Sequence, residues 1–177
     1  MSLLRRPFQY RFNNIALIFI LINAGIFVFY SVGSASMKRD LEIALPMIPA
    51  MVLEGNVWQL VTYMFFHADL SHLFFNMIGL FFFGVHIERY LGSKEFALFY
   101  LLCGALAGLI SFIMFVLSGT YIVFLLGASG AIYAVLLAFA AFFPDERIYV
   151  MGIIPVRAPI LVIIFTDRKS TRLNSSH

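Results

Sequence analysis

Four long apolar runs, separated by short polar stretches, constrain this chain more than any other feature. They cover approximately residues 15–32, 70–90, 96–117 and 127–143. A helix of about 20 apolar residues spans a bilayer. The 177-residue chain is 62% hydrophobic and only 12% charged, so it has too few polar side chains to cover a soluble domain. The sequence therefore predicts an all-α, polytopic transmembrane helix bundle with four complete spans.

A fifth apolar run begins near Ala158 and stops at Phe165, well short of a span. Residues 167–177, which follow, are polar and basic and contain no aromatic side chain. This string resembles the in-frame translation of a sequencing-library adapter, and a genuine juxtamembrane tail is the alternative. We therefore expect a partial membrane domain at residues 1–166, a foreign tail at residues 167–177, and a natural sequence that continues differently.

The distribution of Lys and Arg predicts how the spans are oriented. If the N-terminus is inside, most of these residues lie on the inner side, and only Lys38 and Arg39 lie outside. Positive charge favours the cytoplasmic side, so we expect a multi-pass integral protein with a cytoplasmic N-terminus. The short loops favour a bacterial inner membrane. The net charge of +3 is spread over several loops, which does not favour nucleic-acid binding.

Two interrupted stretches are predicted to be loops, and no second domain is indicated. Residues 33–58 mix charged residues and prolines with apolar side chains, which is typical of an amphipathic segment at the bilayer surface. Residues 148–157 contain Pro155, and Pro159 follows shortly afterwards. Because proline interrupts regular backbone hydrogen bonding, we expect a loop there.

Polar side chains inside the predicted second span need a reason, because burying them in a membrane is costly. His72 and Asn76 are four residues apart, so a helix places them on one face, and His67 precedes them. Such residues can simply hold helices together. A metal site is a third possibility, but no suitably placed acidic ligand accompanies the two histidines, so we expect no metal.

Ser129 lies at the start of the fourth span, between Gly127 and Gly130. The glycines allow close approach of a backbone or a substrate, although small residues repeated every four positions also fit a helix-packing seam. A helix from Ser129 to Phe143 would be about 22 Å long, which puts the serine in the outer half of the membrane, with His72. A serine near hydrogen-bond donors has most of the parts for acyl transfer, and it still needs a base.

Taken in order, these residues resemble the motifs of the rhomboid family of intramembrane serine proteases. The matching pattern, which runs through most of residues 10–166, is Trp58, His67-Ala-Asp-Leu-Ser-His72-x-x-x-Asn76, Gly84-x-x-x-Glu88-x-x-x-Gly92 and Gly127-Ala-Ser129-Gly130-x-x-Tyr133. The resemblance implies six helices in the full protein, a Ser-His dyad, no cofactor, and cleavage of protein substrates in or near their transmembrane segments.

The resemblance also implies a role for each matching residue. Ser129 corresponds to the nucleophile, His72 and Asn76 to the pair that stabilises the oxyanion, and His67 to a supporting histidine. Tyr133 corresponds to the aromatic residue that packs against the catalytic histidine. Glu88 corresponds to a structural acid that holds the inner loop.

The family's base is a histidine on the sixth helix, which this sequence does not include. We therefore expect the chain as written to be inactive, and the protein that contains the missing helix to be a serine endopeptidase. The alternative is a catalytically silent rhomboid-like protein that binds membrane clients. A transporter or channel is a distant third possibility, because the inner halves of the spans carry few ionisable residues. The sequence gives no indication of oligomeric state.

Overall fold

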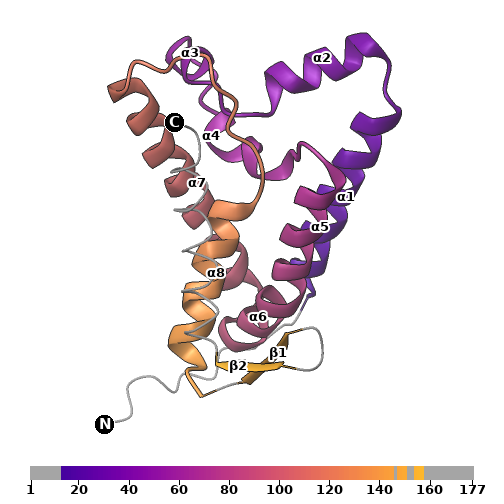
Figure 1. Cartoon of the computed structure of the whole chain (residues 1–177), viewed down its shortest axis with the longest axis vertical. Coiled ribbons are helices and arrows are strands. Elements are labelled where there is room, and N and C mark those ends of the chain that lie inside the picture. Colours follow the sequence, from indigo (N-terminus) through magenta and orange to yellow (C-terminus); the bar gives the residue numbers. More distant parts are fainter. Residues whose placement is uncertain (1–12, 146, 151–153, 158–177) are drawn as a thin grey trace.

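Three helices in this computed structural model are long and apolar enough to cross a membrane. They are α1 (Ile15–Val32), the continuous helix Leu70–Leu91, and α7 (Ser93–Leu117). The apolar helix α8 (Ser129–Phe142) has 14 residues and is shorter. The structure describes residues 13–145, 147–150 and 154–157. Within them the four helices lie alongside one another as a bundle (Figure 1), which confirms the predicted fold class. The predicted fifth span and the tail lie outside the described residues.

The second membrane helix is built from three pieces, α5 (Leu70–Gly79), a π-helical turn η2 (Leu80–Gly84) and α6 (Val85–Leu91). The sequence analysis predicted the helix but not the π turn. A π turn inserts an extra residue into the helical register. The side chains of α6 are therefore rotated about the helix axis relative to the positions that a regular continuation of α5 would give them, although both helices belong to one span.

The segment predicted as an amphipathic loop contains two helices, α2 (Ala35–Ala44) and α3 (Pro49–Leu53). The Ser34 side chain accepts a hydrogen bond from the Met37 N–H and caps α2, and Pro49 occupies the first turn of α3, where its missing N–H is not needed. Capping thus stabilises short helices in a sequence that is interrupted by polar residues and prolines. The loop prediction was incomplete because it did not include these two helices. The short helices α4 (Gln59–Thr62) and η1 (Tyr63–Phe65) follow.

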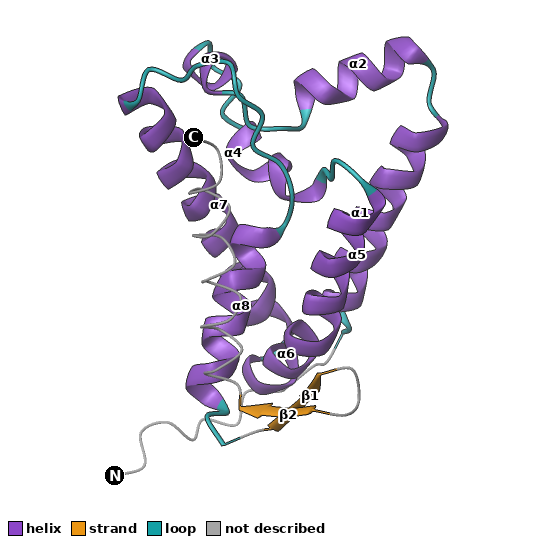
Figure 2. Cartoon of the chain, in the orientation of Figure 1, coloured by secondary structure: helices purple, strands orange, loops and turns teal. Residues whose placement is uncertain are grey.

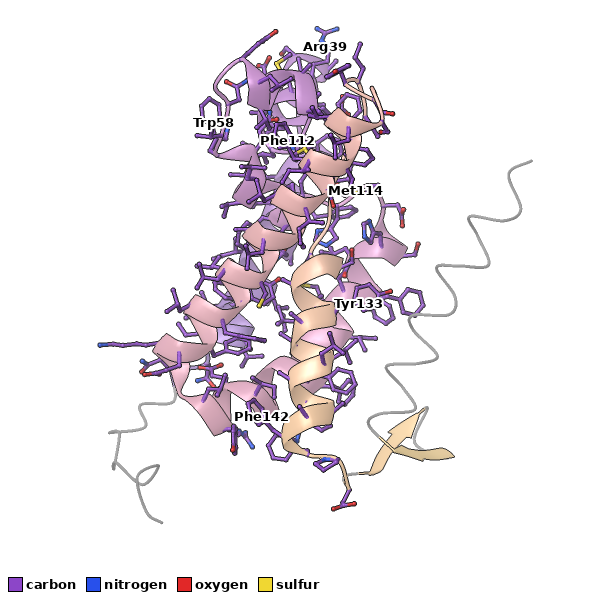
Figure 3. All side chains as sticks on the ribbon, turned by 90° about the vertical axis from the view of Figure 1, so that its left-hand side faces the viewer. Arg39, Trp58, Phe112, Met114, Tyr133 and Phe142 are labelled. Carbon is purple, nitrogen blue, oxygen red and sulfur yellow. The ribbon has the colours of Figure 1, made fainter. Side chains whose placement is uncertain are left out.

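A buried glutamine holds this segment to the bundle. The Gln59 side chain is fully buried, its Oε1 accepts from the Ile48 N–H at 3.0 Å, and its Nε2 donates to the Ile43 carbonyl at 2.7 Å. Figure 3 shows Arg39 and Trp58 at this end of the molecule, Phe142 at the opposite end, and Tyr133 between them.

The prediction of a loop over residues 148–157 was wrong for residues 148–150 and 154–157, which the structure describes as strands. Strands β1 (Arg147–Val150) and β2 (Ile154–Arg157) pair antiparallel (Figure 2). In their register Tyr149 lies opposite Pro155. Proline lacks an N–H, but it is tolerated at the edge of a sheet, and both strands of a two-stranded hairpin are edges. Ile154 and Val156, which flank Pro155, are β-branched and favour strand structure, as does Tyr149 on the other strand. The hairpin is a local addition to a helical molecule.

Small residues bring α7 and α8 into close contact. A β-carbon at Gly130 would lie 2.8 Å from Cβ of Ala107, and one at Gly104 would lie 3.3 Å from Cβ of Ala131. The Tyr63 hydroxyl donates to the Gly104 carbonyl at 2.8 Å. Gly130 therefore takes part in a helix-packing seam, as one interpretation of the sequence expected.

Candidate active site

The N-terminus of α5 is organised by Asp69, which caps the helix. Its Oδ1 accepts from the His72 backbone N–H at 2.8 Å and from the Ser71 hydroxyl at 2.5 Å. The hydrogen bond from Ser71, followed by the one from the His72 N–H, lowers the pKa of this exposed carboxyl. Asp69 thus fixes the turn that carries His72. Sequence reasoning missed this residue, although Asp directly before an apolar helix is a standard N-cap signal.

His67 lies behind this turn and is almost completely buried. Its Nε2 accepts from the Ala128 N–H at 3.4 Å, so the loop that precedes α8 rests on this ring. The His67 and His72 rings meet edge to face, with centroids 5.1 Å apart. Burial, followed by the neighbouring His72, lowers the pKa of His67 to about 4, so the ring is neutral at physiological pH.

Gly127 brings the same loop against His72. Its φ of 98° lies in the region that favours glycine, and a β-carbon there would lie 2.4 Å from Cε1 and 2.6 Å from Nε2 of His72. Its N–H donates to the Tyr63 carbonyl at 2.9 Å. Conformation and space therefore both require glycine at this position, and Ser129 follows as the first residue of α8.

Ser129, His72 and Asn76 open onto one cavity of about 530 Å³ between α5 and α8. Two elements far apart in the sequence thus bring together the three residues predicted to carry the chemistry. Tyr133, one turn after the serine, also lines this cavity. The remaining lining is largely apolar and comprises Phe75, Ile78, Gly79, Phe83, Ile132 and Leu136, together with Asp69 and Ser71.

Asn76 is held in place by its own helix. Its side chain is largely buried, and its Nδ2 donates to the His72 carbonyl at 2.9 Å. An amide NH₂ group carries two hydrogens, so the second one remains to be donated to a group in the cavity. Asn76 can therefore supply a hydrogen bond to a developing negative charge without leaving its position.

Glu88 lies away from this cavity, where α6 meets the start of α1. Its two carboxylate oxygens accept from the N–H groups of Ile15 and Ala16 at 2.8 and 2.9 Å, and Oε1 also accepts from the Ser93 hydroxyl. Glu88 thus supplies the first turn of α1 with the cap that Asn14 does not provide. The structure does not bring Glu88 to the site of Ser129, and the contacts that it makes are structural ones.

Within the described part of the chain, no group of three or more His, Cys, Asp or Glu side chains could hold a metal ion. Apart from the Asp69 carboxylate, the polar groups of the cavity are hydroxyls, an imidazole and an amide. These groups are suited to nucleophilic attack and hydrogen bonding.

Comparisons with known proteins place the chain in a family. A model of the Rhomboid domain matches residues 54–169. RHOMBOID-like protein 12, mitochondrial, of Arabidopsis thaliana is 30% identical over an alignment of 183 residues, which covers 93% of this chain and 52% of that protein. Rhomboid protease GluP of Bacillus subtilis is 33% identical over 87 residues, or 49% of this chain and 16% of that protein.

A mammalian relative is also similar. Presenilin-associated rhomboid-like protein, mitochondrial, of Bos taurus is 32% identical over 131 residues, which covers 74% of this chain and 34% of that protein. The chain thus spans about half the length of the Arabidopsis relative and smaller shares of the other two. The family model, the relatives and the helical membrane fold agree, and the chain belongs to the rhomboid family.

Proposed function

We propose that the complete protein is an intramembrane serine endopeptidase that cleaves transmembrane proteins, with Ser129 as its nucleophile. The observation that carries this proposal is the shared cavity, which is lined by Ser129, His72 and Asn76 at the ends of two helices. A hydroxyl that shares a mostly apolar cavity with two hydrogen-bonding side chains is an arrangement for acyl transfer.

In the proposed reaction, Ser129 Oγ attacks the carbonyl carbon of the scissile peptide while a base removes the hydroxyl proton. Donors from Asn76 and from the His72 ring stabilise the negative charge on the carbonyl oxygen. The tetrahedral intermediate expels the amine, which takes up the proton, and leaves an ester on Ser129. Water then hydrolyses this ester and regenerates the hydroxyl. No cofactor is needed in this sequence of steps.

We propose that the base is a histidine in the part of the protein that replaces residues 167–177 and follows the membrane domain of residues 1–166. The His67 ring contacts the Ala128 N–H through Nε2, and the His72 ring packs against Gly127. We therefore assign both histidines to the support and hydrogen-bonding of the site.

The proposed function also requires a membrane location and an orientation for the protein. The chain is an integral, multi-pass membrane protein, and we propose a bacterial inner membrane with a cytoplasmic N-terminus. The support is the distribution of Lys and Arg and the shortness of the loops. The relatives come from a bacterium and, under mitochondrial names, from a plant and an animal. Fusion of topology reporters to residue 1 and to the exposed turn at Gly119 tests the orientation.

The experiment that tests the activity is Ser129→Ala in the complete protein, reconstituted in liposomes with a model transmembrane substrate. We expect kcat/KM to fall by a factor of about 10³ or more, because the nucleophile is lost. The matched control is Ser118→Ala, since Ser118 is an exposed serine at the end of α7. If the Ser129→Ala variant cleaves normally, the nucleophile assignment fails. If the unmodified protein binds the substrate and never cleaves it, a silent client-binding protein is the better description.

A further inference from the structure

Asp69 is a charged side chain at the edge of an otherwise neutral cavity. The other residues that line the cavity are apolar or carry neutral polar groups, apart from the imidazole of His72. Asp69 is exposed, whereas Asn76, deeper in the cavity, is largely buried. A substrate that enters the cavity from this side therefore passes a single negative charge.

The carboxylate is held in a fixed orientation and can still accept further hydrogen bonds. The bonds from Ser71 and from the His72 N–H both end on Oδ1. A carboxylate offers about four lone-pair sites, so Oδ2 is available to a donor from outside the helix. The Ser71 and His72 bonds also stabilise the charged form of the group.

Capping alone does not explain a charge at this position. Asn and Ser cap helices about as well as Asp. Since Oδ1 makes both of the hydrogen bonds that organise the turn, an amide oxygen could accept the same two bonds. The cap and the charge can therefore be separated by experiment.

The geometry also limits which part of a substrate can reach Asp69. Three residues of helix separate Asp69 from His72, which corresponds to about 4.5 Å along the axis of α5. An extended substrate advances by about 3.3 Å per residue. A long basic side chain within about three residues of the scissile bond can therefore extend to the carboxylate, with its apolar stem along the cavity wall.

From this juxtaposition we propose that Asp69 is a specificity-determining residue, which favours transmembrane substrates with a Lys or Arg within about three residues of the scissile bond, on the side of the cavity mouth. This inference rests on the proposed protease function, and it adds a class of preferred substrate to it. The basic side chain pairs with Oδ2, while Oδ1 continues to cap α5.

The test compares model transmembrane substrates that differ at one position near the scissile bond, where they carry Lys, Gln or Glu. With the complete protein in liposomes, we expect kcat/KM for the Lys substrate to exceed that for the Gln substrate by about threefold to fivefold, as for an exposed ion pair, and the Glu substrate to be the poorest. In Asp69→Asn the ratio of kcat/KM between the Lys and Gln substrates, and that between the Glu and Gln substrates, should fall to about one. In the control variant Asp40→Asn, in which an exposed carboxylate on α2 is neutralised, the preference should persist.

Equal rates for the Lys and Gln substrates, or a preference that survives Asp69→Asn, would overturn the proposal. So would a preference that is lost equally in Asp40→Asn, because the effect would then come from general surface charge. If the complete protein cleaves none of the substrates, the protease function fails, and the affinity of the same three peptides for the protein and for Asp69→Asn decides the inference separately. Tighter binding of the Lys peptide that depends on Asp69 supports it, and equal binding overturns it.

Discussion

The two ends of the membrane helix Leu70–Leu91 each carry a carboxylate, and the two carboxylates are used in opposite ways. Near the C-terminal end, Glu88 is almost completely buried and accepts three hydrogen bonds from α1 and α7. At the N-terminal end, Asp69 is exposed and makes its hydrogen bonds within its own first turn. We call the surroundings of Glu88 and Ser93 the anchor end, and those of Asp69, His72 and Ser129 the cavity end.

This difference in hydrogen bonding distinguishes the end of the helix that is fixed to its neighbours from the end that can bind a ligand. A buried carboxylate is tolerated only when its oxygens are satisfied, and at the anchor end they are, by backbone N–H groups of another helix. This arrangement joins α1 to α6. At the cavity end, His67 Nδ1 is buried without a partner among the described residues. A buried polar group without a hydrogen-bond partner lowers the stability of the fold, and such unsatisfied groups are typical of binding sites.

The largest effect is expected from Gly127→Ala, at the cavity end. The new methyl group would overlap the His72 ring, and the positive φ would strain any residue with a side chain. We expect a fall in cleavage of about 100-fold, because displacement of His72 by roughly 1 Å misaligns the site. Stability should fall by about 1–3 kcal/mol, measured by denaturation in detergent.

Gly119→Ala provides the matched control. Gly119 also has a positive φ, but a β-carbon there meets nothing within 4 Å. This variant should lose about 1 kcal/mol through backbone strain and retain its cleavage activity. If both variants lose activity equally, strain rather than contact with His72 is responsible, and the assignment of Gly127 to the site is wrong.

The next largest effect is expected from Glu88→Gln, at the anchor end. The amide cannot accept at both ends of the side chain, so either Ile15 or Ala16 loses a partner for its N–H in a buried position. We expect the variant to lose about 2–4 kcal/mol of stability, while the cleavage rate per folded molecule stays the same. Equal losses of stability and of specific activity would show that the two ends are not independent.

Glu95→Gln is the control for this change. Glu95 lies in the first turn of α7, near the same end of the bundle, and its side chain is exposed. Loss of an exposed charge should change stability by less than about 0.5 kcal/mol.

Much of the bundle could be predicted because a membrane span needs about 20 apolar residues in a row. The first predicted span matches α1 at both bounds, and the third begins only a few residues late. The π turn at Leu80–Gly84 could not be predicted, because a run that is apolar on all sides has no periodicity that an inserted residue would disturb. The hairpin was not predictable from local sequence, because Pro155 indicates a loop whereas its β-branched neighbours favour a strand.

The candidate site was partly predictable for a similar reason. Helical spacing puts His72 and Asn76 on one face, and the length of α8 puts Ser129 at a similar depth. The contact between His67 and the Ala128 N–H joins residues that are 61 positions apart, and it depends on how the loop before α8 folds back. No local pattern contains that information. The catalytic roles themselves stay predictions.

A smaller effect is expected when the pH is lowered, and it should come from the cavity end. The pKa of His67 is lowered to about 4 in the folded protein, against about 6.5 for an exposed histidine. Between these values the unfolded chain binds more protons than the folded one, so stability falls as the pH drops from about 6.5 to 4. We expect His67 to contribute about 1–2 kcal/mol to this fall, because solvent that reaches the partly open site reduces the full effect.

The measurement is thermal or denaturant unfolding in detergent at a series of pH values, for the unmodified chain and for His67→Gln. The glutamine can still accept from the Ala128 N–H but does not titrate in this range. Between about pH 6.5 and 4 the stability of the His67→Gln variant should fall less than that of the unmodified chain, by the amount assigned to His67. Curves of identical slope for these two proteins would mean that His67 is not held neutral by burial.

The smallest effect is expected from Tyr63→Phe, which separates the two kinds of support that one residue gives. The Tyr63 carbonyl accepts from the Gly127 N–H and supports the cavity end, whereas its hydroxyl donates to Gly104 on α7 and supports the bundle. The substitution removes only the second bond, so stability should fall by about 1 kcal/mol, and cleavage should stay within about twofold of normal. Because a helical carbonyl such as that of Gly104 retains its backbone partner, no buried acceptor is left empty, and the loss stays small. A larger fall in cleavage than in stability would mean that the α7 contact positions the loop before Ser129, and that the site depends on the whole bundle rather than on the cavity end alone.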